Sequence, residues 1–408
     1  MRPIKLCVIF DQRLHSGGGF QQSINDAINV KKLPKNLCEV FFFSTIPDNI
    51  SLLEKNGIEA EYLEFSVFQK IISILRRITN PFLLRYFRLF AKHSPFEKFL
   101  IQKKIDLVYF LSPSELAFDL DEINFFITVW DLCHRDEVEF PEIRANKEFE
   151  LREIKYKTLL PKATATIVDS DLGKVNVHKR YQVDLDRIYI LPFKPSNMIQ
   201  GCNDSISKKS DFNCINKYDI KFPYIYYPAQ LWPHKNHKYI LKGLDILIRK
   251  YKIKCGAIFS GKDKGNLVYL KNLTHELDLD QYTRFIDFVP DREVVDLYSN
   301  AFALVMPSYF GPTNIPPLEA FHMGLPVIYS DRKDFRDHIG DAAIYVDLNN
   351  PESLALSIKT LFDDNKFRLS LIKKGYEKLD YLNNYDRLGI LENIVIEFRN
   401  KRECWDRY

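Results

Sequence analysis

Residues 307–324, PSYFGPTNIPPLEAFHMG, combine groups that can hold a phosphate and a pair of hydroxyls. The segment lies between two apolar runs. Pro317 fits the first turn of a helix and Gly324 fits just past its end, so we predict a helix of about two turns. Its N-terminus should point outward at the carboxyl edge of a sheet, where ligands of open α/β sheets bind. Glu319 is then placed to accept hydrogen bonds from paired hydroxyls such as those of a ribose, unless it only complements the helix dipole.

A second segment, YPAQLWPHKNH at 227–237, directly follows an apolar run. Lys235, in a loop between a strand and a helix, is a point cation suited to a diphosphate. A solvated lysine beside a helix N-terminus is the alternative. The density of Trp, Pro, His and Asn around Lys235 argues for the phosphate-binding interpretation.

A glycine cluster, SGGGF at 16–20, follows the first apolar run. Glycines between a strand and a helix let backbone N–H groups approach a phosphate or a sugar. A dinucleotide site would need a third glycine where Gln22 stands. Glu39 also precedes the second apolar run instead of ending it, which argues against a dehydrogenase. A merely flexible loop remains the alternative.

A third group of polar residues, Asp131, His134 and Arg135, ends another apolar run and precedes Phe140-Pro141-Glu142. These side chains can orient the hydroxyls of a sugar or an acceptor at the edge of a cleft. A structural salt bridge between Asp131 and Arg135 is the alternative.

The elements that must position these groups are short apolar runs alternating with longer amphipathic stretches. Continuous apolar strands separated by helices indicate parallel sheets covered on both faces. The expected strands of the first half are Leu6–Phe10, Val40–Phe43, Leu107–Leu111, Phe125–Trp130, Thr166–Val168 and Ile188–Leu191. Those of the second half are Tyr224–Tyr227, Gly256–Ser260, Thr283–Phe288, Ala303–Met306, Pro326–Tyr329 and Ala343–Val346. The expected helices include Tyr239–Tyr251 and Asp291–Asn300.

The length of 408 residues suits two domains. A polar stretch rich in Pro, Ser, Asn, Asp and Lys separates the two halves. We therefore predict an α/β chain of two Rossmann-like, doubly wound parallel-sheet domains facing each other across a cleft. The expected parts are residues 1–195, a linker at 196–221, a second domain at 222–385, and a C-terminal helix at 386–408 that can return to the first domain.

The bulk composition narrows the classes of partner. A net charge of +4 does not argue for nucleic acid, so we expect no nucleic-acid partner. No secretory signal and no run of eighteen apolar residues is present, so we expect a cytoplasmic protein that can sit peripherally at the inner face of a membrane. The cysteines are scattered and odd in number, which predicts reduced thiols and no zinc site. They are Cys7, Cys38, Cys133, Cys202, Cys214, Cys255 and Cys404.

The glycine cluster, the lysine segment and the stretch PLEAFHMGLPVI at 317–328 occur in an order and spacing that resemble glycosyltransferase family 4, the retaining enzymes of the GT-B fold. The resemblance covers nearly the whole chain. The last stretch is quite specific, whereas the glycine cluster alone is a weak signal. The combination of WPHKNH with FGPTN is similar to a branch of bacterial surface-polysaccharide transferases, which make O-antigen or capsule.

The resemblance implies a metal-independent hexosyltransferase without a cofactor. It would move a hexose from a nucleotide sugar, with GDP-mannose as the first candidate, to a lipid-linked or surface-polysaccharide glycan. Residues 1–195 would be the acceptor side and 222–385 the donor side. Lys235 would neutralise the donor diphosphate, Glu319 would bind the ribose, and Gly18 would supply backbone donors. The backbone at Thr313, Asn314 and Ile315 would hold phosphate and sugar. The predicted donor-binding set also contains Gly19, Gln230, His234, Asn236, Gly261 and Val289.

Three positions depart from the family pattern. The usual first glutamate, eight residues before Glu319, is Gly311, and the usual arginine, five residues before the lysine, is Gln230. Asn314 and His234 are our candidates to compensate for the missing acid and cation. In the first half, Trp130 stands where the family often has a histidine before the aspartate.

Three other functions compete with this interpretation. A glycoside hydrolase needs two carboxylates flanking one bond, and only Glu319 is well placed. A non-catalytic sugar-nucleotide or glycan-binding protein is consistent with the departures. A metal-dependent transferase of the other common fold would use an Asp-x-Asp pair, although the pair that directly follows a strand also fits a helix start, which we favour. The four such pairs are Asp119/Asp121, Asp169/Asp171, Asp184/Asp186 and Asp278/Asp280, of which Asp169/Asp171 follows the strand.

The stretch from Ser66 to Lys104 carries nine Lys and Arg against a single acid, Glu97. Apolar residues are interleaved at helical intervals, and such a basic amphipathic face suits an anionic membrane. A solvated basic face above an ordinary core is the alternative. The cations are Lys70, Arg76, Arg77, Arg85, Arg88, Lys92, Lys98, Lys103 and Lys104, and the apolar residues include Phe68, Ile71, Ile72, Leu75, Leu83, Phe87 and Phe90.

Overall fold

The computed structural model describes residues 2–14, 18–76, 92–201, 214–311 and 313–405. Contacts divide the chain into two compact units. The N-terminal unit comprises Met1–Leu132, Glu150–Pro192 and Tyr385–Tyr408, and the C-terminal unit comprises Cys133–Phe149 and Phe193–Asn384. The division differs from the expected boundaries at Cys133–Phe149, which we call the inserted segment. Its sequence neighbours belong to the N-terminal unit, but it packs within the C-terminal unit.

Within the described residues, the N-terminal unit is built on a seven-stranded parallel sheet of order β3-β2-β1-β4-β5-β6-β7. The strands are β1 Ile4–Phe10, β2 Cys38–Ser44, β3 Ala60–Tyr62, β4 Leu107–Phe110, β5 Asn124–Thr128, β6 Thr166–Val168 and β7 Ile188–Ile190. Six of them coincide with predicted apolar runs to within a few residues. β3 was not predicted because its three residues, AEY, are largely exposed and form no apolar run.

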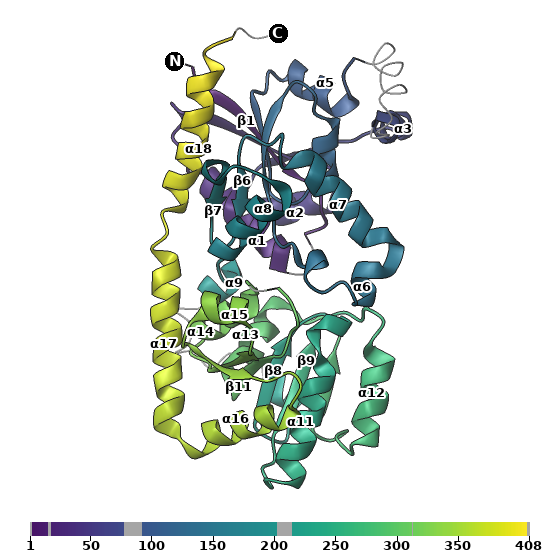
Figure 1. The fold of residues 1–408 in the computed structure, drawn as a ribbon, viewed down its shortest axis with the longest axis vertical. Coiled ribbons are helices and arrows are strands. Elements are labelled where there is room, and N and C mark those ends of the chain that lie inside the picture. The colour runs from purple at the N-terminus through teal and green to yellow at the C-terminus, as the bar shows by residue number, and fades with distance from the viewer. Residues whose placement is uncertain (1, 15–17, 77–91, 202–213, 312, 406–408) are drawn as a thin grey trace. The chain divides into compact units, whose positions relative to one another are not determined.

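Both faces of this sheet are covered by helices. Alternate residues of β1 point to opposite faces, so Leu6 and Val8 enter one core while Cys7 and Ile9 enter the other. The helices are α1 Gly18–Val30, α2 Asp48–Lys55, α3 Val67–Arg76, α5 Pro95–Gln102, α7 Glu148–Leu159 and α8 Asp171–Tyr181. The last helix of the chain, α18 Arg387–Arg402, also belongs to this unit (Figure 1). It packs on α1 and places Leu391, Ile394, Val395 and Phe398 in the first core.

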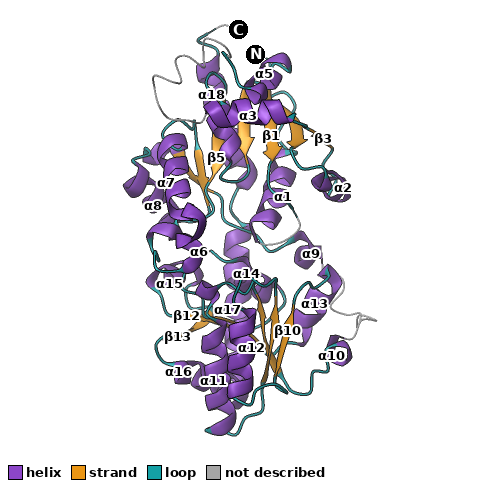
Figure 2. Cartoon of the chain, turned by 90° about the vertical axis from the view of Figure 1, so that its right-hand side faces the viewer, coloured by secondary structure: helices purple, strands orange, loops and turns teal. Residues whose placement is uncertain are grey.

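Within the described residues, the C-terminal unit has a six-stranded parallel sheet of order β10-β9-β8-β11-β12-β13, with helices on both sides (Figure 2). The strands are β8 Tyr224–Pro228, β9 Gly256–Ser260, β10 Thr283–Ile286, β11 Ala303–Met306, β12 Val327–Ser330 and β13 Ala343–Val346. The main helices are α11 His237–Arg249, α12 Leu267–Glu276, α13 Asp291–Asn300, α14 Ile315–His322, α15 Lys333–Ile339, α16 Pro351–Asp363 and α17 Asn365–Asn383. The shorter ones are α6 Pro141–Arg144, α9 Asn197–Gln200 and α10 Cys214–Lys217.

The prediction of two doubly wound parallel sheets is therefore confirmed. In both sheets the strand order reverses once, between β1 and β4 in the N-terminal unit and between β8 and β11 in the C-terminal unit. Open α/β sheets bind ligands at the carboxyl ends of the strands, at such a switch point. None of the helices in the described ranges has the length and apolar character needed to cross a bilayer.

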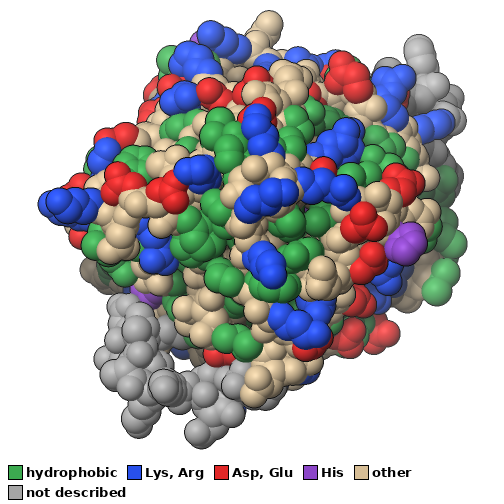
Figure 3. All heavy atoms as spheres, turned by 90° about the horizontal axis from the view of Figure 1, so that it is seen from below, with side chains coloured by type: hydrophobic (Ala, Val, Ile, Leu, Met, Phe, Trp, Pro, Cys, Tyr) green, Lys and Arg blue, Asp and Glu red, His purple; other side chains and the backbone are tan. Residues whose placement is uncertain are grey.

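The amino edge of the C-terminal sheet carries stacked aromatic rings. Phe222 lies on Tyr282 with 4.8 Å between ring centroids, and Phe302 lies on Phe362 at 4.1 Å. Arg368 sits over the Phe302 ring. Seen from below, this unit shows hydrophobic side chains interspersed with Lys and Arg (Figure 3). These rings close the core at the edge opposite the loops described next.

Candidate functional site

The lysine segment and the loop before Glu319 meet at the switch point of the C-terminal sheet. The chain leaves β8 through a short 3₁₀ turn, Pro233–Lys235, and leaves β11 through residues 307–314. β8 and β11 are paired neighbours, so both loops start at the same edge. Lys235 Nζ donates a hydrogen bond to Asn314 Oδ1 at 3.0 Å. The structure therefore brings together the two segments that the sequence singled out.

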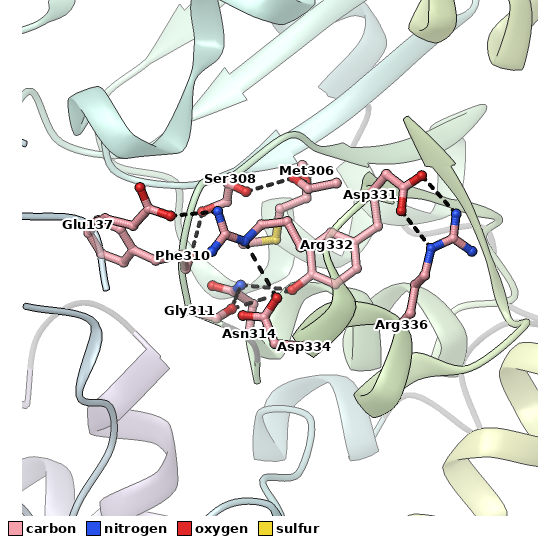
Figure 4. Close-up of polar contacts among 12 residues, drawn as sticks. Glu137, Met306, Ser308, Phe310, Gly311, Asn314, Asp331, Arg332, Asp334 and Arg336 are labelled. Atoms are coloured by element: carbon pink, nitrogen blue, oxygen red, sulfur yellow. Dashed lines mark hydrogen bonds and ion pairs between the residues drawn. The ribbon is translucent and has the colours of Figure 1, made fainter. Parts of the chain in front are cut away.

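Further hydrogen bonds hold the two loops in register. Tyr309 N donates to His234 O at 2.9 Å, and Tyr227 Oη donates to Lys235 O at 3.0 Å. Asn314 Nδ2 donates to the Tyr329 hydroxyl at 2.9 Å and to Gly311 O (Figure 4). The position of the lysine is thus fixed by backbone contacts as well as by its own side chain.

The N-terminus of α14 faces this lysine. Asn314 is the residue before the helix, but its side chain makes no capping hydrogen bond to the helix and binds Lys235 instead. Backbone N–H groups of a first helical turn, together with the helix dipole, attract anions. Thr313 and Ile315 on either side are buried. A cation and a helix start aimed at one place form a phosphate-binding arrangement.

Glu319 lies deeper than the sequence suggested. α14 begins at Ile315, so Glu319 is in the second turn, and no acid occupies the first turn, where an interaction with the helix dipole is strongest. Its carboxylate accepts hydrogen bonds from Tyr298 Oη at 2.8 Å and from Ser196 N at 3.4 Å. Burial raises the pKa of Glu319, although these hydrogen bonds oppose the shift.

Four other predicted donor residues lie around the same edge. Gln230 Oε1 accepts from Trp232 Nε1 at 2.9 Å, and Val289 is half-buried against the core. Asn236 has φ 55° and turns the chain from the 3₁₀ turn into α11. Gly261 packs so closely that a Cβ there would lie 2.5 Å from the Ala229 carbonyl oxygen. Only glycine therefore allows the ends of β8 and β9 to approach in this way.

The inserted segment adds residues that the sequence did not assign. Glu142, at the start of α6, accepts hydrogen bonds on Oε1 from His234 N at 3.0 Å and from the His234 ring Nδ1. Burial raises the pKa of Glu142, but the hydrogen bonds from His234 outweigh it, and the pKa lies below its usual value. The His234 ring stacks on Phe310 with 3.8 Å between centroids.

A second ion pair and a ring contact fix the inserted segment. Arg332 Nη1 donates to Glu137 Oε1 at 2.6 Å, and its Nε lies 3.5 Å from Asp334 Oδ1 (Figure 4). Phe140 contacts Tyr309 and Phe310 with centroid distances of 5.3 and 5.7 Å. The inserted segment therefore packs against the loop that follows β11. No sequence signal marks these partners, because they are far away along the chain.

The third predicted group is divided between the two units. Asp131 belongs to the N-terminal unit, where its Oδ1 accepts from Arg152 Nη1 at 3.0 Å. His134 and Arg135 form a 3₁₀ turn with Cys133 in the inserted segment. The His134 side chain is completely buried and packs edge-on against Phe149.

The glycine cluster stands at the switch point of the N-terminal sheet. Residues 15–17 lie outside the described residues, and α1 begins at Gly18. A Cβ at Gly19 would lie 2.6 Å from the Trp130 ring. Gly19 therefore lets α1 approach the end of β5 closely.

A pocket of about 410 Å³ opens at the same carboxyl edge. Its wall includes Asp11, Tyr62, Lys70, Glu115 and Asp119. Ser112 Oγ and Ser114 Oγ, both just after β4, donate to the Asp11 carboxylate at 3.2 and 2.5 Å. Burial raises the pKa of Asp11, and the two serine hydrogen bonds oppose the shift. No local sequence pattern marks this pocket.

The Asp169/Asp171 pair occupies a helix start, as the favoured interpretation predicted. Ser170 is the N-cap of α8, and its Oγ accepts from Gly173 N at 3.1 Å. Asp169 is buried, and burial raises its pKa to about 7. Across the described ranges, no three His, Cys, Asp or Glu side chains come together as metal ligands would.

Part of the chain matches a known protein family. Residues 212–378 match the family described as Glycosyl transferases group 1. O-antigen chain mannosyltransferase B of Escherichia coli is 23% identical over 220 residues, which cover 53% of this chain and 56% of that protein. O-antigen chain mannosyltransferase RfbU of Salmonella typhimurium is 28% identical over 195 residues, covering 46% and 48%. The chain thus spans about half the length of the curated relatives it matches.

Solved structures match over nearly the whole chain. HepE of Anabaena, in complex with UDP-glucose, has a TM-score of 0.68 at 14% identity and covers 97% of this chain and 100% of its own. WaaG, a glycosyltransferase involved in lipopolysaccharide biosynthesis, has a TM-score of 0.64 at 14% identity, with coverage of 96% and 98%. At this identity the likeness concerns the fold alone, and it confirms the predicted GT-B fold.

Proposed function

We propose that the chain transfers a hexose from a nucleotide sugar to a glycan, with retention of configuration, since residues 212–378 match the family described as Glycosyl transferases group 1. One observation carries the proposal. Lys235 reaches Asn314 at the start of α14, at the switch point of the C-terminal sheet. Breaking the bond between sugar and diphosphate requires stabilisation of the leaving diphosphate, and preorganised donors and cations provide it. Lys235 and the first N–H groups of α14 would do so without a metal ion or cofactor.

The other donor residues would complete the site. The Glu319 carboxylate would accept hydrogen bonds from the ribose hydroxyls. These would replace or join the hydrogen bonds that it accepts from Tyr298 and Ser196. Gly18 and Gly19 would present backbone N–H groups, while Gln230, Asn236, Gly261 and Val289 would line the donor. Asp131, His134 and Arg135 would orient hydroxyls of sugar or acceptor.

We propose GDP-mannose as the donor to test first, since two of the relatives are named mannosyltransferases. UDP-glucose is the main competitor, because it is the ligand in the HepE structure. A thermal-shift panel of nucleotides and nucleotide sugars separates them. A ligand at about 100 times its dissociation constant should stabilise the protein by about 2.7 kcal/mol. Lys235→Ala should abolish the shift, whereas Lys238→Ala, an exposed neighbour, should retain it. A panel without any shift would refute the proposal.

The acceptor would bind in the N-terminal unit. The pocket beside Asp11 offers carboxylates that accept hydrogen bonds from sugar hydroxyls, and its volume of about 410 Å³ lies in the range of small-molecule sites. We propose a lipid-linked or surface-polysaccharide glycan, in line with the O-antigen relatives.

A lipid-linked acceptor would bring the enzyme to a membrane surface, at the cytoplasmic face. α3 supports this docking, since Val67, Phe68 and Ile74 are 75%, 71% and 61% exposed beside Lys70. Arg77, Arg85 and Arg88 of the basic stretch, and Leu83, Phe87 and Phe90, lie outside the described residues. Liposome flotation should show binding to vesicles with anionic lipid and little binding to neutral ones. Equal, negligible flotation with both would exclude docking.

Binding without transfer is the second candidate function. Gly311 and Gln230 place no carboxylate and no cation where the resemblance expects them. Transfer or donor hydrolysis by the purified protein separates the two functions. The same assay repeated in EDTA tests metal independence, because activity that survives chelation excludes a role for all four Asp-x-Asp pairs.

A further inference from the structure

The inserted segment places a carboxylate beside the donor loops of the C-terminal unit. The Glu142 side chain is only 7% exposed, and its partner His234 directly precedes Lys235 in the chain. The His234 ring is stacked on Phe310, in the loop that leads to Asn314. Glu142 is therefore bonded directly to the lysine loop, and through the His234 ring it is linked to the loop that leads to Asn314.

The two oxygens of this carboxylate are used differently. Oε1 accepts both hydrogen bonds from His234. Oε2 is buried and has no hydrogen-bond partner among the residues that the structure describes. An unpartnered buried polar atom costs about 1–3 kcal/mol, more when it is charged, so such atoms are rare in folded proteins. An oxygen left in this state beside a binding loop indicates that a ligand completes it.

The chemistry of the oxygen restricts that ligand. An ionised carboxylate only accepts hydrogen bonds, so its partner must carry an O–H or N–H group. The pKa of Glu142 lies below its usual value, so the group is ionised at neutral pH. A phosphate would be repelled. In a nucleotide sugar both the ribose and the hexose carry hydroxyls next to the diphosphate. Since Glu319 is proposed to bind the ribose, the hexose is the part left for Glu142.

We propose that Glu142 Oε2 accepts a hydrogen bond from a hydroxyl of the hexose of the nucleotide-sugar donor, while His234 holds the carboxylate in place. This proposal rests on the proposed function and adds a sugar-recognising residue to it. Gly311, which carries no side chain, lies next to Phe310 in the loop that Phe140 contacts. The acid for the sugar is thus supplied by the inserted segment.

The experiment compares donors with and without the sugar. Titration calorimetry gives dissociation constants of the wild type for GDP and GDP-mannose, and for UDP and UDP-glucose. The pair that binds is then measured with Glu142→Gln and Glu142→Asp. We expect each variant to bind the diphosphate like the wild type and to bind the sugar nucleotide about tenfold more weakly, since a hydrogen bond to a charged group is lost or displaced. Glu137→Gln, which alters the other ion pair of the inserted segment, should retain both constants.

Three results would overturn the proposal. One is an equal loss of diphosphate and sugar-nucleotide binding in Glu142→Gln, which would mean that Glu142 only anchors the segment. Another is unchanged binding of both ligands in both variants. The third is a wild type that binds none of the four ligands, and in that case the proposed function fails as well. Melting temperatures without ligand identify a variant that is merely unfolded, and Glu142→Asp, which keeps the charge, provides the second reading.

Discussion

The two sheets have the same topology at their carboxyl edges but opposite chemistry. At the N-terminal switch point, the loops after β1 and β4 meet through Asp11 and its two serine partners. At the C-terminal switch point, the loops after β8 and β11 meet through Lys235 and Asn314. An anionic acceptor of hydrogen bonds suits hydroxyl groups, whereas a cation at a helix start suits phosphate. The fold thus supplies two equivalent switch points. Side chains in the loops after β1 and β8, Asp11 and Lys235, decide what each one can bind.

Lys235→Ala, which removes the cation of the C-terminal switch point, should have the largest effect on transfer. Without the cation, the leaving diphosphate loses its main stabilising side chain, so we expect kcat/KM for transfer to fall by about a hundredfold or more. Steady-state kinetics with the donor found in the ligand panel measure it. Lys238→Ala, an exposed lysine on α11, serves as the matched control. A Lys235 variant with near-normal rates would show that the C-terminal switch point is not the phosphate site.

A buried acid of the N-terminal unit should make stability depend on pH. The pKa of Asp169 is raised by burial to about 7, so the folded state holds this proton more tightly than the unfolded chain does. The protonated Asp169 side chain makes its full contribution to the free energy of unfolding below about pH 4, and this contribution is lost as the pH rises through about 7. Asp169→Asn mimics the protonated form. We expect the free energy of unfolding of this variant, relative to that of the wild type, to rise by about 2 kcal/mol from pH 5 to pH 8, as measured by denaturant unfolding. A constant difference across that range would contradict the shifted pKa.

Asp11→Asn tests whether the N-terminal switch point binds the acceptor. The amide has the shape of the carboxylate, but only its oxygen can accept a hydrogen bond. It therefore cannot accept from both Ser112 and Ser114, and the pocket loses a fixed hydrogen-bond acceptor. We expect KM for the acceptor to rise about tenfold with an unchanged donor dissociation constant. Glu39→Gln, on β2 outside the pocket, is the control. If Asp11→Asn weakens donor binding and leaves KM for the acceptor unchanged, the N-terminal switch point binds the donor and the assignment is wrong.

Ser170→Ala should have the smallest effect. The loss of the N-cap hydrogen bond to Gly173 should destabilise the protein by about 1 kcal/mol, as seen in thermal unfolding. Transfer kinetics at a temperature well below the unfolding transition should not change, because the Asp169/Asp171 pair serves a helix start. Lost activity with intact stability would revive the metal-dependent interpretation.

The fold could be read from the sequence because its strands are continuous apolar runs in both halves. β3 could not be predicted because its residues are exposed and form no apolar run. α14 starts two residues before Pro317 because two successive prolines fit a first turn. Lys235 and Asn314 were predictable since each follows a strand in a dense local motif. Glu142 and His234 are 92 residues apart, and Asp11 and Ser112 are 101 apart. Such pairings arise only when the topology brings distant loops together, and no local pattern reports them.

The position of α18 has a consequence for how the molecule is made. Its apolar residues, up to Phe398, complete the core beneath β1, so this core joins a strand and a helix that are far apart in the chain. Domains generally fold as units during synthesis. β1 leaves the ribosome long before α18, so the core on this face of the sheet stays incomplete until the C-terminal unit has been made. The N-terminal unit is therefore completed only after the C-terminal unit.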